Sequence, residues 1–253
     1  MTGAARVTYV GHATVLVEMD GVRLLTDPVL RRRVGPLRRH GPAPDPQLME
    51  SVDAVLISHL HHDHADVPSL RRLSRAVPVF ASPGARGFIE SLGFGDVREL
   101  APGESAGVGD VRVTATEANH PAGGRRFERA SRAVGFELTG QRRIYFAGDT
   151  DLFDGMEGIG EDGIDLALLP IWGWGTSIGA GHLDPKRAAR AAALLSPRAV
   201  VPIHWGTLYP LGLARLRPGP LHAPPREFVA QMRALAPQVE ARVLAPGETT
   251  SLS

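Results

Sequence analysis

Cysteine is absent from this chain of 253 residues. Its absence excludes disulfide bonds, thiolate metal ligands and a cysteine nucleophile together. Disulfides are typical of oxidising compartments, so a chain without cysteine suits the cytoplasm. We therefore expect a cytoplasmic protein whose chemistry depends on side chains other than thiols.

Segments that direct a protein to a membrane are also missing. Residues 1–10 contain one arginine and no apolar core, so they do not resemble a secretory signal. No apolar run approaches the roughly 20 residues that a membrane-spanning helix needs. We expect no transmembrane segment.

The chain has no large excess of either charge, since its formal net charge is +1. Any attraction to a charged partner must therefore be local. The one marked charge run is Arg31–His40, which we expect to be a solvated loop. The sharper hypothesis makes it a platform for a phosphate-bearing substrate or an anionic membrane surface. Nucleic-acid binding is not expected, because no aromatic residues are interleaved with the arginines.

Hydrophobic residues make up 43% of the chain, enough for one large domain over residues 1–253. Short β-branched and apolar runs bounded by Gly, Pro and Asp predict strands, and they alternate with helical patterns. This alternation predicts a layered α/β fold. Strands are predicted over residues 7–10, 13–19, 22–26, 53–58, 77–81, 97–100, 111–116, 133–138, 143–147, 164–169, 199–203 and 240–244.

The clearest helix is predicted over residues 184–195, where Asp184 suits the N-cap and Pro185 the first turn. Other helices are predicted to begin near Asp66 and to cover residues 83–92 and 226–235. Residues 29–46 show no periodicity and are predicted to form a long surface loop.

One short motif occurs twice, as Leu100-Ala-Pro-Gly-Glu104 and Leu244-Ala-Pro-Gly-Glu248. Each copy follows a strand-like run, and Pro-Gly favours a type II turn. The repeat is either a common turn used twice by chance or a sign of two similar halves.

The histidines carry the strongest functional signal. Five of the six residues in His59-Leu-His-His-Asp-His64 can bind a metal, and the run follows a buried strand. Alone, it could be a surface tract or an adventitious metal site, and a single strand-end histidine is more often structural. However, His120, Asp149 and His204 also follow apolar strands. Their common placement predicts one metal site along an edge of the sheets.

The order of these residues resembles the metallo-β-lactamase fold superfamily over nearly the whole chain. The motifs Gly11-His-Ala-Thr14, Leu25-Thr-Asp-Pro28, Tyr145-Phe-Ala-Gly-Asp-Thr150, Gly181-His-Leu-Asp-Pro185 and Ile203-His-Trp-Gly-Thr207 resemble one branch of it. That branch contains N-acyl phosphatidylethanolamine-hydrolysing phospholipase D and ascorbate-6-phosphate-lactonase-like proteins.

The resemblance implies a four-layer αββα sandwich with two divalent metal ions. One ion would take His59, His61 and His120, the other Asp63, His64 and His204, and Asp149 would bridge them. The ions would share a hydroxide nucleophile, which Asp63 would orient. The absence of cysteine argues against a true β-lactamase. Histidine at position 61, where di-iron relatives have glutamate, favours Zn²⁺ or Mn²⁺ and hydrolysis.

Residues around the predicted ligands have assignable roles as well. His182 precedes a helix N-terminus on a glycine-rich segment, so we expect it to bind an anionic group or protonate a leaving oxygen. Asp27 either orients a ligand histidine or caps a turn, and His12 either faces the same cavity or does not. Trp172 and Trp174 form an apolar wall over the metals or pack in the core. His62 is expected to face solvent.

We therefore expect a hydrolase of phosphodiesters, acting on small or lipid-like anionic substrates. A lactonase or other ester hydrolase is the first alternative, and a metal-binding scaffold without turnover is the second. Residues 208–220, apolar and rich in Pro and Gly, shape substrate entry or an interface. The sequence is compatible with a homo-oligomer and with peripheral membrane contact.

Overall fold

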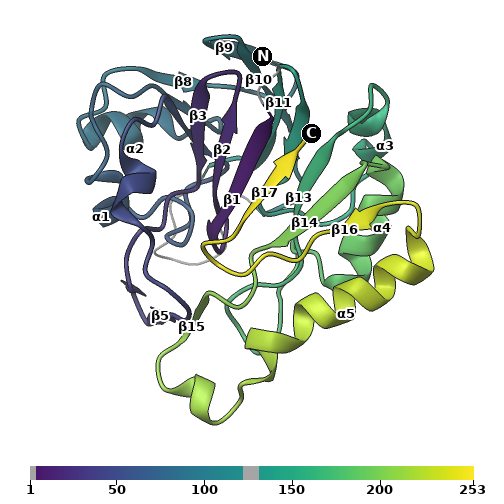
Figure 1. The fold of residues 1–253 in the computed structure, drawn as a ribbon. Helices are drawn as coiled ribbons and strands as arrows, with labels where there is room; N and C mark the ends of the chain where they lie inside the picture. Colours follow the sequence, from purple (N-terminus) through teal and green to yellow (C-terminus); the bar gives the residue numbers. More distant parts are fainter. Residues whose placement is uncertain (1–3, 122–130) are drawn as a thin grey trace.

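Two seven-stranded sheets lie face to face in the computed structural model, which describes residues 4–121 and 131–253 (Figure 1). The first has the order β17 (Thr249–Leu252), β1 (Ala5–Gly11), β2 (Thr14–Met19), β3 (Val22–Thr26), β6 (Ala54–Ile57), β7 (Val79–Ala81), β8 (Val97–Glu99). The second has the order β16 (Glu240–Ala241), β14 (Ala199–Ile203), β13 (Leu166–Pro170), β12 (Arg143–Phe146), β11 (Val134–Thr139), β10 (Val111–Glu117), β9 (Ser105–Val108).

The two sheets have the same internal pattern. In the first sheet β17, β1, β2 and β3 pair antiparallel, and β3, β6, β7 and β8 pair parallel. In the second sheet β9 to β12 pair antiparallel, and β12, β13, β14 and β16 pair parallel. The chain thus contains two similar halves, as one interpretation of the repeated motif suggested.

The repeated motif occupies equivalent places in these halves. One copy connects β8 to β9 and the other connects β16 to β17, so both cross between the sheets. Glu104 accepts a hydrogen bond from the Ala101 N–H at 2.8 Å, and Glu248 accepts one from the Ala245 N–H at 2.8 Å. The same hydrogen bond at matching positions favours the interpretation as two similar halves.

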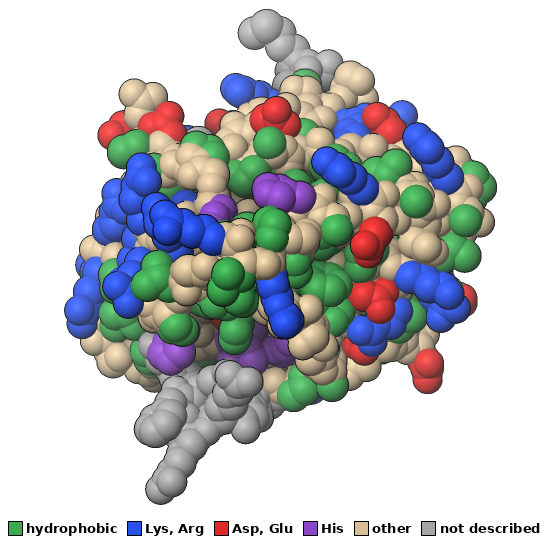
Figure 2. All heavy atoms as spheres, turned by 90° about the horizontal axis from the view of Figure 1, so that it is seen from below, with side chains coloured by type: hydrophobic (Ala, Val, Ile, Leu, Met, Phe, Trp, Pro, Cys, Tyr) green, Lys and Arg blue, Asp and Glu red, His purple; other side chains and the backbone are tan. Residues whose placement is uncertain are grey.

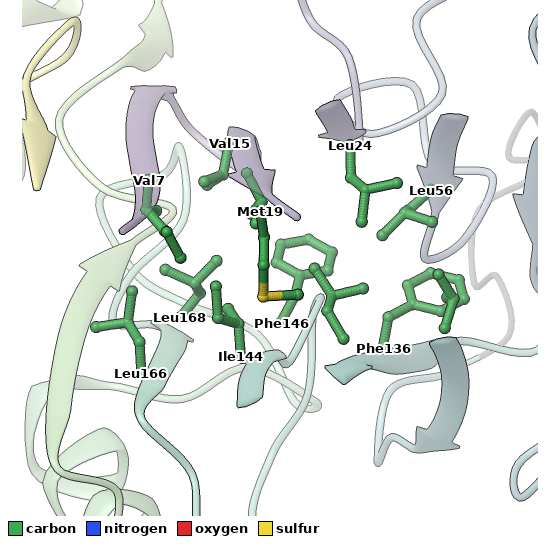
Figure 3. Packing of buried hydrophobic residues seen from close by; sticks show 14 of the residues in the cluster. Val7, Val15, Met19, Leu24, Leu56, Phe136, Ile144, Phe146, Leu166 and Leu168 are labelled. Carbon is green, nitrogen blue, oxygen red and sulfur yellow. The ribbon is translucent and has the colours of Figure 1, made fainter. Parts of the chain in front are cut away.

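Helices cover the outer faces of both sheets, so the four-layer αββα sandwich is confirmed. A continuous apolar core fills the space between the sheets, with side chains from β1, β2, β3 and β6 meeting those from β11, β12 and β13 (Figure 3). One outer core lies under α1 (Val67–Leu70) and α2 (Arg86–Ser91). The other lies under α3 (Met156–Gly160), α4 (Pro185–Leu195) and α5 (Gly219–Leu235).

Helix starts follow the predicted capping signals at two places. Asp66 caps α1 through the Ser69 N–H, and Asp184 caps α4 through the Arg187 N–H. The last helix begins at Gly219, seven residues before the predicted Arg226. The predicted helix began directly after Pro224 and Pro225, because proline lacks the N–H donor that a helix interior needs. Both are buried within the helix. Among the described residues, no helix has both the length and the hydropathy of a membrane span.

The predicted loop over residues 29–46 was wrong. It contains β4 (Arg33–Val34) and β5 (Leu37–Arg39), which form a small sheet with β15 (Leu208–Pro210), followed by the 3-10 helix η1 (Pro46–Met49). Val29, Val34, Leu37 and Leu208 form its apolar core. Strands of two or three residues carry too little periodicity to be recognised. A second 3-10 helix, η2 (Leu213–Arg215), follows β15.

The C-terminal prediction was only partly right. The strand predicted over residues 240–244 is limited to Glu240–Ala241, and β17 was not predicted. Burial along β17 follows the pattern exposed, intermediate, exposed, buried, so only its last residue carries a strong apolar signal.

Candidate metal centre

Six polar residues follow strands that point the same way. Within each sheet the pairing makes β1, β3 and β6 run in one direction, and likewise β10, β12 and β14. Strands of one direction end at the same sheet edge, and this edge is where α/β layers hold their sites. The residues just beyond these ends are His12, Asp27, His59, His120, Asp149 and His204.

One cluster combines His59, His61 and His120. Their ligand atoms lie within 4.8 Å of one another. His59 Nε2 is 2.9 Å from His61 Nδ1, and His120 Nε2 is 3.3 Å from the same nitrogen. These are the three residues that the resemblance assigns to one metal ion.

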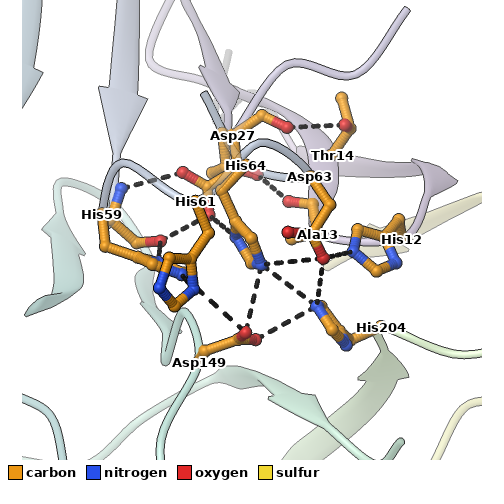
Figure 4. Close-up of polar contacts among 12 residues, drawn as sticks. His12, Ala13, Thr14, Asp27, His59, His61, Asp63, His64, Asp149 and His204 are labelled. Carbon is orange, nitrogen blue, oxygen red and sulfur yellow. Dashed lines mark hydrogen bonds and ion pairs between the residues drawn. The ribbon is translucent and has the colours of Figure 1, made fainter. Parts of the chain in front are cut away.

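A second cluster combines Asp63, His64 and His204, again with ligand atoms within 4.8 Å, and His12 joins it (Figure 4). His64 Nε2 and His204 Nε2 are 3.1 Å apart, and Asp63 Oδ2 lies 3.9 Å from each. The structure therefore also brings together the three residues expected at the second ion.

Asp149 lies between the clusters. Its Oδ2 is 3.1 Å from His64 Nε2 and 3.9 Å from His59 Nε2, and its Oδ1 is 3.2 Å from His204 Nε2. Gly148 makes this approach possible, because a Cβ there would come within 2.8 Å of Ser58 Cβ and the backbone has φ +61°. Asp149 therefore contacts residues of both clusters, as a ligand shared by both ions, implied by the resemblance, would have to do.

In three of the imidazoles the outer nitrogen forms a hydrogen bond that points away from the centre. The Nδ1 atom of His64 contacts Asp27 Oδ2 at 2.7 Å. The Nδ1 atoms of His120 and His204 contact the carbonyl oxygens of Gly181 and Trp172, each at 2.8 Å. A carbonyl oxygen only accepts, so these Nδ1 atoms carry the proton and the Nε2 lone pairs face inward.

Nitrogen lone pairs that face the buried centre need a hydrogen-bond donor or a cation as a partner. His120 Nε2 and His59 Nε2 both approach His61 Nδ1, and one proton on that nitrogen satisfies only one of them. The buried Oδ1 of Asp149 has no hydrogen-bond partner among the described residues. Neutral imidazoles and carboxylates are the donors that zinc and similar divalent ions take. The residues present thus fit two divalent cations.

The electrostatics agree with this donor set. Burial lowers the pKa of His59 well below its ordinary value and lowers that of His204 to about 3. Burial raises the pKa of Asp149, but the imidazoles of His204 and His64 outweigh it and hold it well below its ordinary range. His64 is the exception, because the carboxylates of Asp149 and Asp27 overcome the effect of burial and raise its pKa well above its ordinary value, which favours the charged imidazole. The middle of the centre therefore attracts positive charge.

His182 reaches the centre from the segment before α4. Its Nε2 is 3.3 Å from Asp149 Oδ2, while its Nδ1 donates to the Ala180 carbonyl at 3.1 Å. Burial lowers its pKa, but the hydrogen bond and charge of Asp149 raise it to about 9. The side chain remains 24% exposed, so it lies at the open side of the centre.

Two open questions about flanking residues have clear answers. Asp27 is fully buried and orients His64, so it does more than cap a turn. His12 faces the centre, with Nε2 2.9 Å from Asp63 Oδ2, and its carbonyl accepts the His204 N–H at 2.8 Å. His62 is exposed, as predicted. Trp174 does not form a wall over the metals but packs against the core of the small sheet.

Sequence reasoning missed Ser58 and Arg187. Ser58 donates through Oγ to Asp27 at 2.6 Å and contacts His59 Nδ1 at 3.0 Å, and its position directly before His59 was the available signal. Arg187 donates to the His182 carbonyl at 2.7 Å and pairs with Asp151 and Asp184. No sequence signal marked Arg187, because its pairing with Asp151 joins two separate segments of the chain.

Ser177 lies in a segment, Gly175-Thr-Ser-Ile-Gly179, that has the spacing of the serine-hydrolase nucleophile turn. Such a turn connects a strand directly to a helix. Ser177 instead is exposed and lies in an irregular segment between β13 and α4. The spacing is therefore coincidental.

Comparisons with known proteins agree with this geometry. A model of the beta-lactamase superfamily domain matches residues 22–205. The chain is 36% identical to a metal-dependent hydrolase of Rubrobacter xylanophilus, over 98% of this chain and 97% of that one. It is 32% identical to N-acyl-phosphatidylethanolamine-hydrolyzing phospholipase D 1 of Caenorhabditis elegans, over 81% of this chain and 64% of that one.

A solved structure resembles the whole fold. Igni18, a metallo hydrolase from the archaeon Ignicoccus hospitalis, matches with a TM-score of 0.73 at 26% identity, over 99% of both chains. The chain does not cover the full length of every relative. The chain is 34% identical to an uncharacterized protein of Mycobacterium tuberculosis over 88% of its own residues, but spans 63% of that protein.

Proposed function

The chain belongs to the metallo-β-lactamase superfamily as a metal-dependent hydrolase, in the branch that includes N-acyl-phosphatidylethanolamine-hydrolyzing phospholipase D, and we propose that it hydrolyses phosphodiesters. The observation that carries the proposal is the convergence of two His/Asp clusters on Asp149. The name of the Caenorhabditis elegans relative supports a phosphodiester substrate, small or lipid-like and anionic.

The proposed ligands divide as the clusters do. His59, His61 and His120 hold one cation. Asp63, His64 and His204 would hold the other, and Asp149, which lies against both clusters, would supply a further carboxylate ligand. Zinc is the proposed metal and manganese the alternative, since imidazole and carboxylate donors suit both. When bound, two such cations lower the pKa of a shared water and polarise a phosphoryl oxygen.

The chain's own groups orient the reactants. Asp63 Oδ2 accepts from His12, which fixes the carboxylate at the centre, where it aligns the attacking water. His182 presents Nε2 toward Asp149 from the exposed side, where it contacts the leaving oxygen of the substrate. The N-terminus of α4 begins at Pro185, directly after this segment, and a helix N-terminus favours an anionic group.

A substrate panel tests the proposal. The metal-loaded protein is assayed with bis-p-nitrophenyl phosphate, a lactone series and a β-lactam, and elemental analysis should approach two ions per chain. We expect turnover of the phosphodiester and none of the β-lactam. Turnover of lactones alone would replace the proposal with an ester hydrolase, and bound metal without any turnover would indicate a scaffold.

Asp149→Ala provides the matching variant. Removing the carboxylate that lies between both clusters should abolish activity and most of the bound metal together. Retention of two ions per chain in Asp149→Ala would contradict the bridging role.

A further inference from the structure

The small sheet presents a basic and apolar surface that the metal centre does not use. We call it the basic face and define it by exposed residues of β4, β5 and the turn after β15: Arg33, Arg38, Leu211, Arg215, Leu216 and Arg217. Lys and Arg side chains gather along the left side of the view from below, which contains this sheet (Figure 2).

The basic face has no compensating negative charge. Residues 28–44 and 204–226 contain no Asp or Glu. None of its four arginines forms an ion pair with an acidic side chain among residues 4–121 and 131–253. Arg31, by contrast, pairs with Asp66 at 2.7 Å, and Arg39 is buried with its guanidinium on the carbonyl oxygens of Val10, Val29 and Arg31. Those two arginines serve the fold. Of the four exposed ones, Arg33 donates to the Gly35 carbonyl of its own turn at 3.0 Å, and none pairs with a carboxylate of the described residues.

The local geometry even places like charges together. Arg33 and Arg38 are register partners across β4 and β5, and Tyr209 of β15 is the next partner of Arg38. Like charges directly opposite each other destabilise a pair of strands. The facing pair of Arg33 and Arg38 lowers the stability of the small sheet, so it indicates a function other than folding.

Exposed leucines lie next to these strands, where the Leu211 N–H donates to the carbonyl of Pro36, between β4 and β5, at 3.0 Å. Leu216 is 80% exposed and Leu211 is 56% exposed, the highest values among the large hydrophobic residues described. Both flank η2, and Leu216 lies between Arg215 and Arg217. A hydrogen bond from the Tyr209 hydroxyl to the Arg217 carbonyl, at 2.9 Å, holds this turn against β15. The leucines are therefore held outward on an ordered support.

We propose that the basic face docks on an anionic lipid bilayer. Arginines at the level of the headgroups bind lipid phosphates, and the two leucines enter the boundary of the acyl chains. Charge complementarity selects this occupant, since unpaired arginines around exposed leucines match a surface that is anionic outside and apolar beneath.

Docking would bring the bilayer beside the metal centre. Trp174 packs against the apolar core of the small sheet, and two residues earlier the Trp172 carbonyl accepts from His204. Histidine side chains reach the surface on the same view from below (Figure 2). The inference does not rest on the proposed phosphodiesterase activity, because docking needs no turnover.

Vesicle co-sedimentation tests the inference. The full chain is mixed with vesicles of phosphatidylcholine alone or with phosphatidylglycerol, and we expect binding to the second that weakens as salt increases. Arg33→Gln/Arg38→Gln should weaken it roughly 30-fold, because each basic residue contributes about fivefold. Leu216→Ser should weaken it about tenfold.

Matched controls separate this face from general effects. Arg112→Gln removes an exposed arginine on β10, and Leu194→Ser a partly exposed leucine on α4, so both should bind as the parent does. Thermal unfolding checks that every variant is folded. Equal binding to both vesicle types, no binding to either, equal losses in the controls, or binding to a DNA duplex but not to vesicles would each overturn the inference.

Discussion

Asp27→Asn tests how the metal centre is held. The Asp27 side chain is fully buried and accepts three hydrogen bonds. Its Oδ1 accepts from the Ser58 N–H at 2.8 Å, and its Oδ2 accepts from Ser58 Oγ at 2.6 Å and from His64 Nδ1 at 2.7 Å. An asparagine has the same shape but only one accepting oxygen.

Both orientations of that asparagine have a cost. If its NH₂ group faces the Ser58 N–H, two donors meet and one buried hydrogen bond is lost. If it faces His64 instead, the proton of His64 must move to Nε2, and the lone pair that faces Asp149 is lost. Leaving a buried donor unsatisfied costs about 1–3 kcal/mol. Changing a residue that orients a metal-bound histidine typically lowers metal affinity about 10- to 100-fold.

The assay measures metal affinity and stability separately. Competition with a chromophoric chelator should show the 10- to 100-fold loss in Asp27→Asn, while chemical denaturation of the metal-free variant should show a loss of about 1–3 kcal/mol. Asp66→Asn is the matched control. Asp66 is also a buried carboxylate, but it caps α1 and pairs with Arg31. A comparable loss of metal affinity in both variants, or none in Asp27→Asn, would refute the assigned role of Asp27.

Two further substitutions probe the open side of the centre. Gly181→Ala should lower stability by about 1–3 kcal/mol and weaken metal binding, because φ is +75° there and a Cβ would lie 3.1 Å from His120 Cα. Thermal unfolding measures the loss of stability, and metal titration measures the loss of affinity. An unchanged metal titration would count against the role of His120. Arg187→Met should lower kcat roughly 10- to 100-fold with metal content unchanged, because Arg187 holds the His182 carbonyl. Arg187→Lys should restore part of kcat, and a loss of metal in Arg187→Met would point to a structural role instead.

The centre was predictable because its signals are local and its convergence follows from topology. His59 to His64 are contiguous, and His120, Asp149 and His204 each end a strand of strong apolar pattern. Strands that run in one direction end at the same edge of a sheet, so recognising the strands was sufficient to predict that these residues lie together. Asp27 and His12 were named as candidates for the same reason.

The small sheet was not predictable on these grounds. Its pairing of Leu37–Arg39 with Leu208–Pro210 joins segments far apart in the chain, and neither is long enough to show alternation. Arg39 illustrates the difficulty. In a run of arginines it reads as a solvated residue, yet its guanidinium is buried on three carbonyl oxygens, a role that only long-range contacts define. Arg187 escaped prediction in part for this reason, because its pairing with Asp151 joins distant segments.

The pairing of β1 with β17 has a consequence for biosynthesis. Ala5 lies opposite Leu252, so β1 is synthesised well before β17, the strand that covers its outer edge. Until then, while the chain emerges from the ribosome, β1 offers open N–H and C=O groups to any passing strand. We therefore expect the outer edge of β1 to need protection during synthesis, whereas β10 of the second sheet pairs at its outer edge with β9, which directly precedes it in the chain.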